Sequence, residues 1–83
     1  MVTEQLLLRF LGDDLNIDTA GISPANPLFS SGIVDSFALI TLMTFIESQC
    51  GFRIGPMEVT LENFDSIDRI LRFAERKTRE AGA

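Results

Sequence analysis

The chain has 83 residues, of which twelve are acidic and seven basic, so its net charge is −5, and it contains one cysteine and no histidine. A chain of this length buries only roughly 60% of its unfolded surface, which leaves little room for a catalytic cleft. Without histidine, a serine or cysteine nucleophile has no imidazole partner, and the commonest metal ligand is missing. The excess of acids argues against nucleic acid as a partner. We therefore predict one non-catalytic domain.

The sequence carries no signal for a membrane or for export. Its first residues lack the basic region and cleavage site of a signal peptide. The longest weakly polar run, residues 37–46, is about half the length that a membrane span requires. One cysteine, Cys50, cannot close an intramolecular disulfide, and we expect it to be a small buried hydrophobe. We predict a soluble, cytoplasmic protein that is a monomer and does not bind membranes.

Apolar residues at helical spacing predict helices along the chain and no strand. The first helix spans residues 3–11, and a long loop over residues 13–35 follows. The second helix begins at Asp35 or Ser36, which are both good N-cap residues. It ends near Gly51, a residue type that commonly closes helices.

The second half of the chain predicts a short helix and a long one. One or two helical turns lie within residues 57–64. Asp65 and Ser66 cap the last helix, with Asp68 reaching back as in a capping box. The fold class is therefore all-α: a small four-helix bundle of three main helices plus one short helix. We expect a single domain over residues 1–83, with an ordered core over residues 3–77 and a C-terminal tail over residues 78–83.

The charges are unevenly divided along the chain. Residues 1–68 hold ten acids against two bases, a net charge of −8, whereas residues 69–83 hold two acids against five bases, a net charge of +3. Basic residues at the end of the last helix complement the negative end of its dipole.

A partial calcium-loop pattern fails on its required positions. Asp14, Asn16 and Asp18 occupy the first, third and fifth places of an EF-hand loop. Thr19 then stands where glycine is needed for the turn, and Ala25 stands where a bidentate glutamate is needed. We therefore expect a solvated loop and no metal site.

The most informative stretch opens the second helix, at Asp35 and Ser36. In the simplest interpretation, both residues only cap the helix. A hydroxyl at the first helical position is also exposed, however, and lies where free backbone N–H groups and the dipole favour an anion. A phosphodiester on the Ser36 oxygen would be stabilised there without disturbing the helix interior. Ser36 is therefore our candidate for attachment of a phosphodiester-linked group.

Three segments carry a resemblance to one known family. They are Leu28-Phe29-Ser30-Ser31-Gly32 with Asp35-Ser36-Phe37, then Cys50-Gly51-Phe52-Arg53-Ile54, then residues 58–67. They resemble, in order, the Asp-Ser-Leu signature, the Phe-Gly-Ile-x-Ile turn and the approach to the last helix in acyl and peptidyl carrier proteins. The resemblance extends over residues 3–77. It implies that a phosphopantetheinyl transferase moves 4'-phosphopantetheine from coenzyme A to Ser36.

Two departures favour one branch of that family. Two residues, Ile33 and Val34, separate Gly32 from Asp35, where fatty-acid carriers typically have one, so the spacing is closer to discrete D-alanyl and nonribosomal-type carriers. Fatty-acid carriers also line the second helix with acids, whereas Glu47 is the only acid between Ser36 and Cys50 here. We predict that partners recognise a nearly uncharged rim around Ser36, formed by Val34, Asp35, Phe37, Ile40, Thr41 and Thr44.

The resemblance implies a non-catalytic carrier that holds a carboxylic acid as a thioester. An adenylating or other acyl-activating enzyme would load it, and downstream acyl- or aminoacyl-processing enzymes would use it, in specialised or nonribosomal-type biosynthesis. A fatty-acid or polyketide carrier is the alternative within this class. A helical interaction domain without a prosthetic group, in which Ser36 is only a cap, is the alternative from another class. A stand-alone enzyme has the least support, because no catalytic constellation can be assembled.

Overall fold

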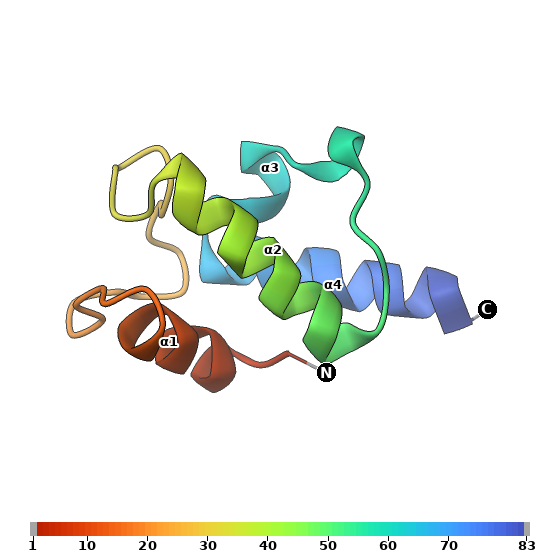
Figure 1. Ribbon diagram of the computed structural model, residues 1–83, viewed down its shortest axis with the longest axis horizontal. Coiled ribbons are helices and arrows are strands. Elements are labelled where there is room, and N and C mark those ends of the chain that lie inside the picture. The colour runs from red at the N-terminus through yellow and green to blue at the C-terminus, as the bar shows by residue number, and fades with distance from the viewer. Residues whose placement is uncertain (1, 83) are drawn as a thin grey trace.

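A computed structural model of the chain describes residues 2–82, and every regular element in that range is helical (Figure 1). The long helices are α1 (Glu4–Asp13), α2 (Ser36–Cys50) and α4 (Ile67–Gly82). Between α2 and α4 lie a single 3-10 turn, η1 (Pro56–Glu58), and the short helix α3 (Leu61–Phe64). The predicted all-α bundle of three main helices and one short helix is confirmed.

Local capping sets the ends of α1 and α2. The Thr3 hydroxyl accepts the Leu6 N–H at 3.2 Å, and the Asp35 carboxylate accepts the Ala38 N–H at 2.8 Å. Gly51 ends α2 in the left-handed conformation, with a φ of 77° that favours glycine. The predicted bounds of α2 therefore agree with the structure.

The start and the end of α4 differ from the sequence-based expectation. The Ser66 hydroxyl accepts the Arg69 N–H at 3.1 Å, so Ser66 alone caps the helix. The third helical position is then Arg69, which cannot accept a hydrogen bond, so the predicted capping box with Asp68 is wrong. At its other end α4 continues to Gly82, through most of the segment that we expected to be a tail. Residue 83 of that segment lies outside the described residues.

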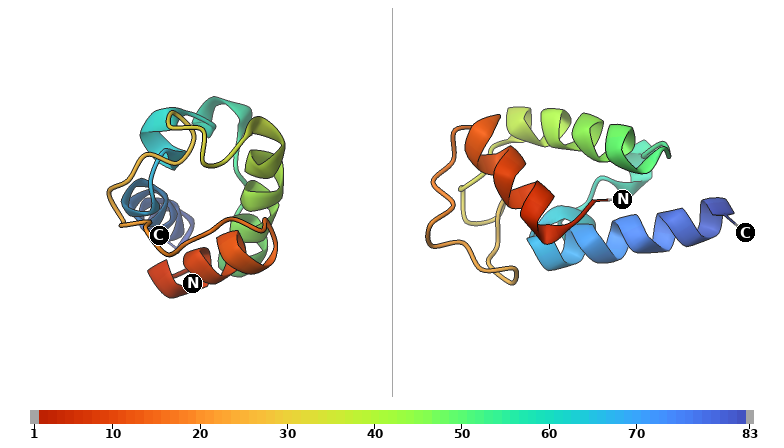
Figure 2. Two further views of the ribbon diagram at one scale, coloured as in Figure 1. Left: turned by 90° about the vertical axis from the view of Figure 1, so that its left-hand side faces the viewer. Right: turned by 90° about the horizontal axis from the view of Figure 1, so that it is seen from below.

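Apolar side chains from the three long helices and the loop before α2 form one core. Phe10 of α1 stacks on Phe45 of α2 with ring centroids 4.3 Å apart, and Phe73 of α4 contacts Phe64 at 5.0 Å. Figure 2 shows α2 and α4 on opposite sides of this core. The other buried apolar side chains are Val2, Leu7, Leu11, Leu28, Val34, Leu42, Ile46, Phe52, Ile67, Ile70 and Ala74. Because the loop contributes Leu28 and Val34, burial of apolar surface holds it against the helices.

The acidic loop after α1 forms a turn of its own. Asn16 adopts a φ of 56°, a conformation that asparagine tolerates better than most residues. The Asp18 carboxylate accepts the Ala20 N–H at 3.0 Å. Among residues 2–82, no three potential metal ligands cluster, and no helix is both long and apolar enough to cross a membrane.

Candidate functional site

Asp65 anchors the loop that leads to Ser36. Its carboxylate accepts the N–H groups of Phe29 and Ser30 at 2.8 and 2.9 Å and the Ser30 hydroxyl at 2.6 Å. Its backbone carbonyl accepts the Leu28 N–H at 2.7 Å. The hydrogen bond from the Ser30 hydroxyl is the largest cause that lowers the pKa of the Asp65 carboxyl, and the backbone bonds add to it. The carboxyl is therefore ionised at neutral pH, and it joins the loop to the junction of α3 and α4.

The last turn of this loop places Val34 inside the protein. Gly32, with a φ of 85°, reverses the chain, and the Val34 N–H then donates to the Leu28 carbonyl at 2.9 Å. The Val34 side chain is only 1% exposed, whereas its neighbour Ile33 is 39% exposed. Our prediction that Val34 belongs to the exposed rim is therefore wrong, because this hydrogen bond folds the chain back and turns its side chain into the core.

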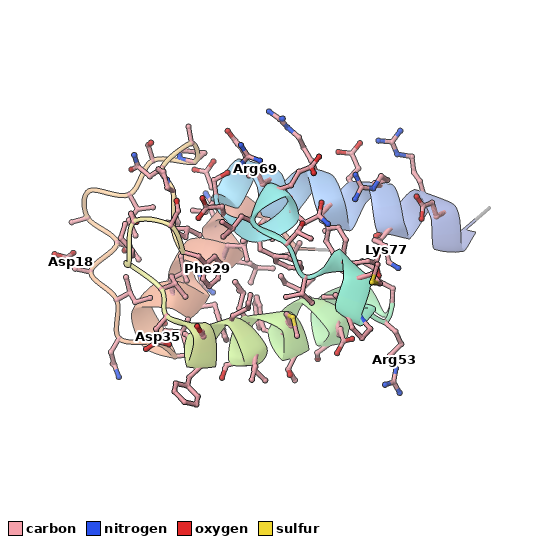
Figure 3. The ribbon with its side chains drawn as sticks, turned by 90° about the horizontal axis from the view of Figure 1, so that it is seen from above. Asp18, Phe29, Asp35, Arg53, Arg69 and Lys77 are labelled. Atoms are coloured by element: carbon pink, nitrogen blue, oxygen red, sulfur yellow. The ribbon has the colours of Figure 1, made fainter. Side chains whose placement is uncertain are left out.

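Ser36 is the exposed first residue of α2. The Asp35 carboxylate, labelled at the start of α2 in Figure 3, accepts the Ala38 N–H. Within residues 2–82, no hydrogen-bond partner is found for the N–H groups of Ser36 and Phe37. The hydroxyl therefore stands beside two free donors at the positive end of the helix dipole. A singly charged phosphodiester on this oxygen fits the surroundings, although the Asp35 carboxylate is an opposing negative charge at the same end.

A hollow of about 340 Å³ opens beside Ser36. Its wall is mostly apolar and comes from the loop, from α2 and from the segment around α3. The residues are Phe29, Ser30, Ser36, Leu39, Val59, Thr60, Leu61 and Phe64. The sequence did not reveal the contribution of residues 59–64, because a four-residue helix is too short for an apolar period to indicate which side chains face Ser36.

The outer face of α2 beyond Ser36 is apolar and carries no charge. Phe37 is 84% exposed and Ile40 is 61% exposed, and Thr41 and Thr44 are also exposed. The Thr44 hydroxyl donates to the Ile40 carbonyl at 3.1 Å, so much of its polarity is used within the helix. Apart from Val34, the side chains of the predicted rim are therefore exposed, and their recognition by partners stays a prediction.

Glu47 and Cys50 lie in the last part of α2 and face other parts of the protein. The Glu47 carboxylate accepts the Ile54 N–H at 2.7 Å and so ties down the turn that follows the helix. The only acid of α2 is thus engaged within the protein. Cys50 packs against the core as a small hydrophobe, as we expected, but it is half-buried and not buried.

Comparison with known proteins identifies the class of protein. Residues 5–74 match the family defined by a phosphopantetheine attachment site. The chain is 26% identical over 76 residues to a protein named probable acyl carrier protein PigG, from Serratia sp. (strain ATCC 39006). That alignment covers 92% of this chain and 87% of the relative. The chain therefore belongs to the phosphopantetheine-attachment family, and the resemblance to carrier proteins is confirmed.

Membership in this family defines the prosthetic group, which is a covalently attached 4'-phosphopantetheine. Carrier proteins of the family are generally non-catalytic. They work with a phosphopantetheinyl transferase, which attaches the arm, and with biosynthetic enzymes that use it.

Proposed function

We propose that Ser36 is the residue that bears the phosphopantetheine arm. One observation supports this assignment above the others: the Ser36 hydroxyl is exposed at the first position of α2, next to two free N–H groups. When bound, the arm supplies a terminal thiol that holds a carboxylic acid as a thioester. The role of the protein is to present Ser36 to solvent at the start of α2. Asp65 and Val34 fix the loop that precedes this helix.

Intact-mass measurement tests the assignment. The purified chain is incubated with coenzyme A and a phosphopantetheinyl transferase of broad specificity, and one phosphopantetheine is expected to be added. Ser36→Ala should gain no mass. Ser48→Ala removes another exposed serine of α2 and should be modified like the wild type. A chain that gains no mass would instead favour a helical interaction domain in which Ser36 is only a cap.

We further propose that the chain is a discrete carrier for an aminoacyl or specialised acyl group. The uncharged outer face of α2 supports this proposal, and Glu47, the only acid of the helix, already accepts the Ile54 N–H through one carboxylate oxygen. An adenylating or other acyl-activating enzyme would load the arm, and acyl- or aminoacyl-processing enzymes would use it. We expect the carrier to act in the cytoplasm, where coenzyme A is available and a lone thiol stays reduced.

Partner enzymes would contact the chain through the exposed residues beside Ser36: Asp35, Phe37, Ile40, Thr41 and Thr44. We expect small interfaces there, with weak and short-lived contacts, which suits a protein that visits several enzymes. The tether then raises the concentration of the cargo at each active site, and tight docking is not needed.

A fatty-acid or polyketide carrier is the second candidate, and the apolar hollow beside Ser36 favours it. The hollow is lined by Leu39, Val59, Leu61 and Phe64 and could take a hydrocarbon chain. Competitive loading separates the two candidates: the modified chain is offered to an amino-acid-adenylating enzyme and to a malonyl transferase. Preferential loading by the adenylating enzyme supports the aminoacyl proposal, and preferential loading by the transferase supports the alternative.

A further inference from the structure

Four arginines form a single row along the outer side of α4. They are Arg69, Arg72, Arg76 and Arg79, at positions i, i+3, i+7 and i+10, which fall on one face of a helix. All four side chains are exposed. At a rise of about 1.5 Å per residue, the row is about 15 Å long. We call these four residues the arginine row.

Most of the arginine row has no acidic partner. Among the residues whose side chains the structure describes, Arg79 pairs with Glu75 at 2.8 Å, and no carboxylate lies within ion-pair distance of the other three. Arg72 has no hydrogen-bond partner in the same part of the chain. Three neighbouring guanidinium groups thus form no direct ion pair, although the acids Glu58, Glu62 and Asp68 lie near them, in a protein of net charge −5.

Contacts with α3 hold two of these arginines in place. Arg69 donates to the Glu62 carbonyl at 3.2 Å, and Arg76 donates to the Asn63 side-chain oxygen over a long 3.4 Å. The Arg76 guanidinium also lies 5.6 Å from the centre of the Phe73 ring. Side chains that are already ordered lose less conformational entropy when a partner binds. Together with Arg72 they border a hollow of about 430 Å³ between α3 and α4.

The arginine row lies away from the Ser36 surface. The labelled Asp35 marks the start of α2 along one edge of the view in Figure 3, and the labelled Arg69 lies on α4 at the opposite edge. These two helices lie on opposite sides of the molecule in both views of Figure 2. A partner that covers the arginine row therefore leaves the first turn of α2 open.

We propose that the arginine row is a second docking surface, and that it binds an acidic helix of a partner protein. Each guanidinium can pair with a carboxylate through two hydrogen bonds. Carboxylates at i, i+3, i+7 and i+10 on a facing helix have the same spacing as the row. Such a partner would retain the carrier while the arm on the opposite side visits other enzymes, at an effective concentration set by the tether.

The shape and surroundings of the row favour this occupant over other anions. A free phosphate ion spans one or two guanidinium groups and leaves the rest of a row of about 15 Å unused. An anionic membrane presents an undivided negative surface, which the flanking acids Glu62, Asp68 and Glu75 would oppose. A helix with a defined pattern of carboxylates avoids these acids and still meets the arginines.

Titration of the full ¹⁵N-labelled chain with a synthetic peptide tests this proposal. The peptide is helical and carries glutamates at i, i+3, i+7 and i+10, and a matched peptide has glutamines there. At low salt, where the Debye length is about 30 Å, the glutamate peptide should shift the amide signals of α3 and α4 and leave the first turn of α2 unchanged. The glutamine peptide should cause no shift.

Charge-removing variants supply the control. The triple variant Arg69→Gln, Arg72→Gln, Arg76→Gln should bind the glutamate peptide about tenfold or more weakly, since three exposed ion pairs are lost. Glutamine is a good helix former, so circular dichroism should show the fold unchanged. The matched double variant Arg9→Gln, Arg53→Gln removes exposed arginines elsewhere and should bind like the wild type.

Four results would overturn the proposal. They are absence of shifts with the glutamate peptide, equal shifts with the glutamine peptide, unchanged affinity of the triple variant, and shifts centred on the first turn of α2. Arginine-dependent binding to phosphatidylserine vesicles would show that the arginine row binds a membrane and not a partner helix. Dimerisation of the chain that the triple variant abolishes would show that it binds a second copy of the chain. None of these measurements needs the arm, so they are independent of the assignment of Ser36.

Discussion

The hydroxyl of Ser30 donates a hydrogen bond of 2.6 Å to the carboxylate of Asp65, although 35 positions separate the two residues. This bond joins the loop before α2 to the residue just before the cap of α4. The same carboxylate also accepts two backbone N–H groups of the loop. The position of the helix end that presents Ser36 therefore depends on a contact with a distant part of the chain.

Removing the Asp65 carboxylate should destabilise the fold. Asp65→Ala leaves the Ser30 hydroxyl and two loop N–H groups without their acceptor, and a cost of about 1 to 2 kcal/mol is expected, because water can reach the exposed part of the site. Asp65→Asn keeps an acceptor and should lose less. Urea unfolding followed by circular dichroism measures the difference. Asp13→Asn, an exposed carboxylate elsewhere, should change stability by less than about 0.5 kcal/mol. Equal midpoints for Asp65→Ala and the wild type would contradict the anchoring role.

Acid should weaken the fold through two carboxyl groups whose pKa values are lowered. The pKa of Asp65 is lowered chiefly by the Ser30 hydroxyl, and the pKa of Glu58 chiefly by the Gly55 N–H, with Lys77 at 3.1 Å as a further cause. A carboxyl with a lower pKa in the folded state binds fewer protons than in the unfolded state. Its stabilising contribution is complete above the unfolded pKa of about 4 and disappears as the pH falls through the folded pKa.

Urea midpoints measured as the pH is lowered from about 6 to about 3, through the unfolded pKa of about 4, test this sign. The wild type should lose stability as the pH falls below about 4, and Asp65→Asn should show a shallower fall over the same range. A wild-type midpoint that rises on acidification, or the same slope in both proteins, would be inconsistent with the lowered pKa of Asp65.

Replacing Phe37 should impair loading without affecting folding. The side chain is 84% exposed, so Phe37→Ser should change the free energy of unfolding by less than about 0.5 kcal/mol. Loss of an apolar contact at the partner interface should lower the kcat/KM of the loading enzyme about tenfold. Met57→Ser removes another exposed apolar side chain, in η1, and should load normally. Wild-type loading of Phe37→Ser would exclude this residue from the interface.

Replacing Val34 should destabilise the fold, in contrast to replacing the exposed Phe37, because the Val34 side chain is buried. Val34→Ala removes apolar volume from the core and should cost about 1 to 3 kcal/mol of unfolding free energy. Ile33→Ala, at the exposed neighbouring position, should cost less. Thermal or urea unfolding of the two variants compares them directly. A larger loss for Ile33→Ala would mean that the loop packs with the other residue inward.

The sequence predicted the long helices because their signals are local. The Asp35 cap, the Gly51 end and an apolar pattern over many residues all lie within α2 itself. The short elements were predicted only as one or two turns within residues 57–64, because η1 and α3 span three and four residues and show no full period. The exposed Ser36 was found because its position at the helix start follows from the same local cap.

Contacts between residues that are far apart in the sequence could not be predicted from the sequence. Asp65 resembles an N-cap, and only the folded chain shows that the distant Ser30 and Phe29 use its carboxylate instead. Adjacent Ile33 and Val34 are equally apolar, so nothing local indicates which one enters the core. The hydrogen bond from the Val34 N–H to the Leu28 carbonyl turns the Val34 side chain into the core. This bond forms only when the loop reverses at Gly32.

Fragment-ion mapping of the modified chain tests the central claim most directly. After incubation with coenzyme A and a phosphopantetheinyl transferase, the chain is digested and the modified peptide is fragmented to locate the added group. We predict that the phosphopantetheine mass lies on Ser36. Its location on Ser30, Ser31 or Ser48, or a chain that remains unmodified throughout, would contradict the account.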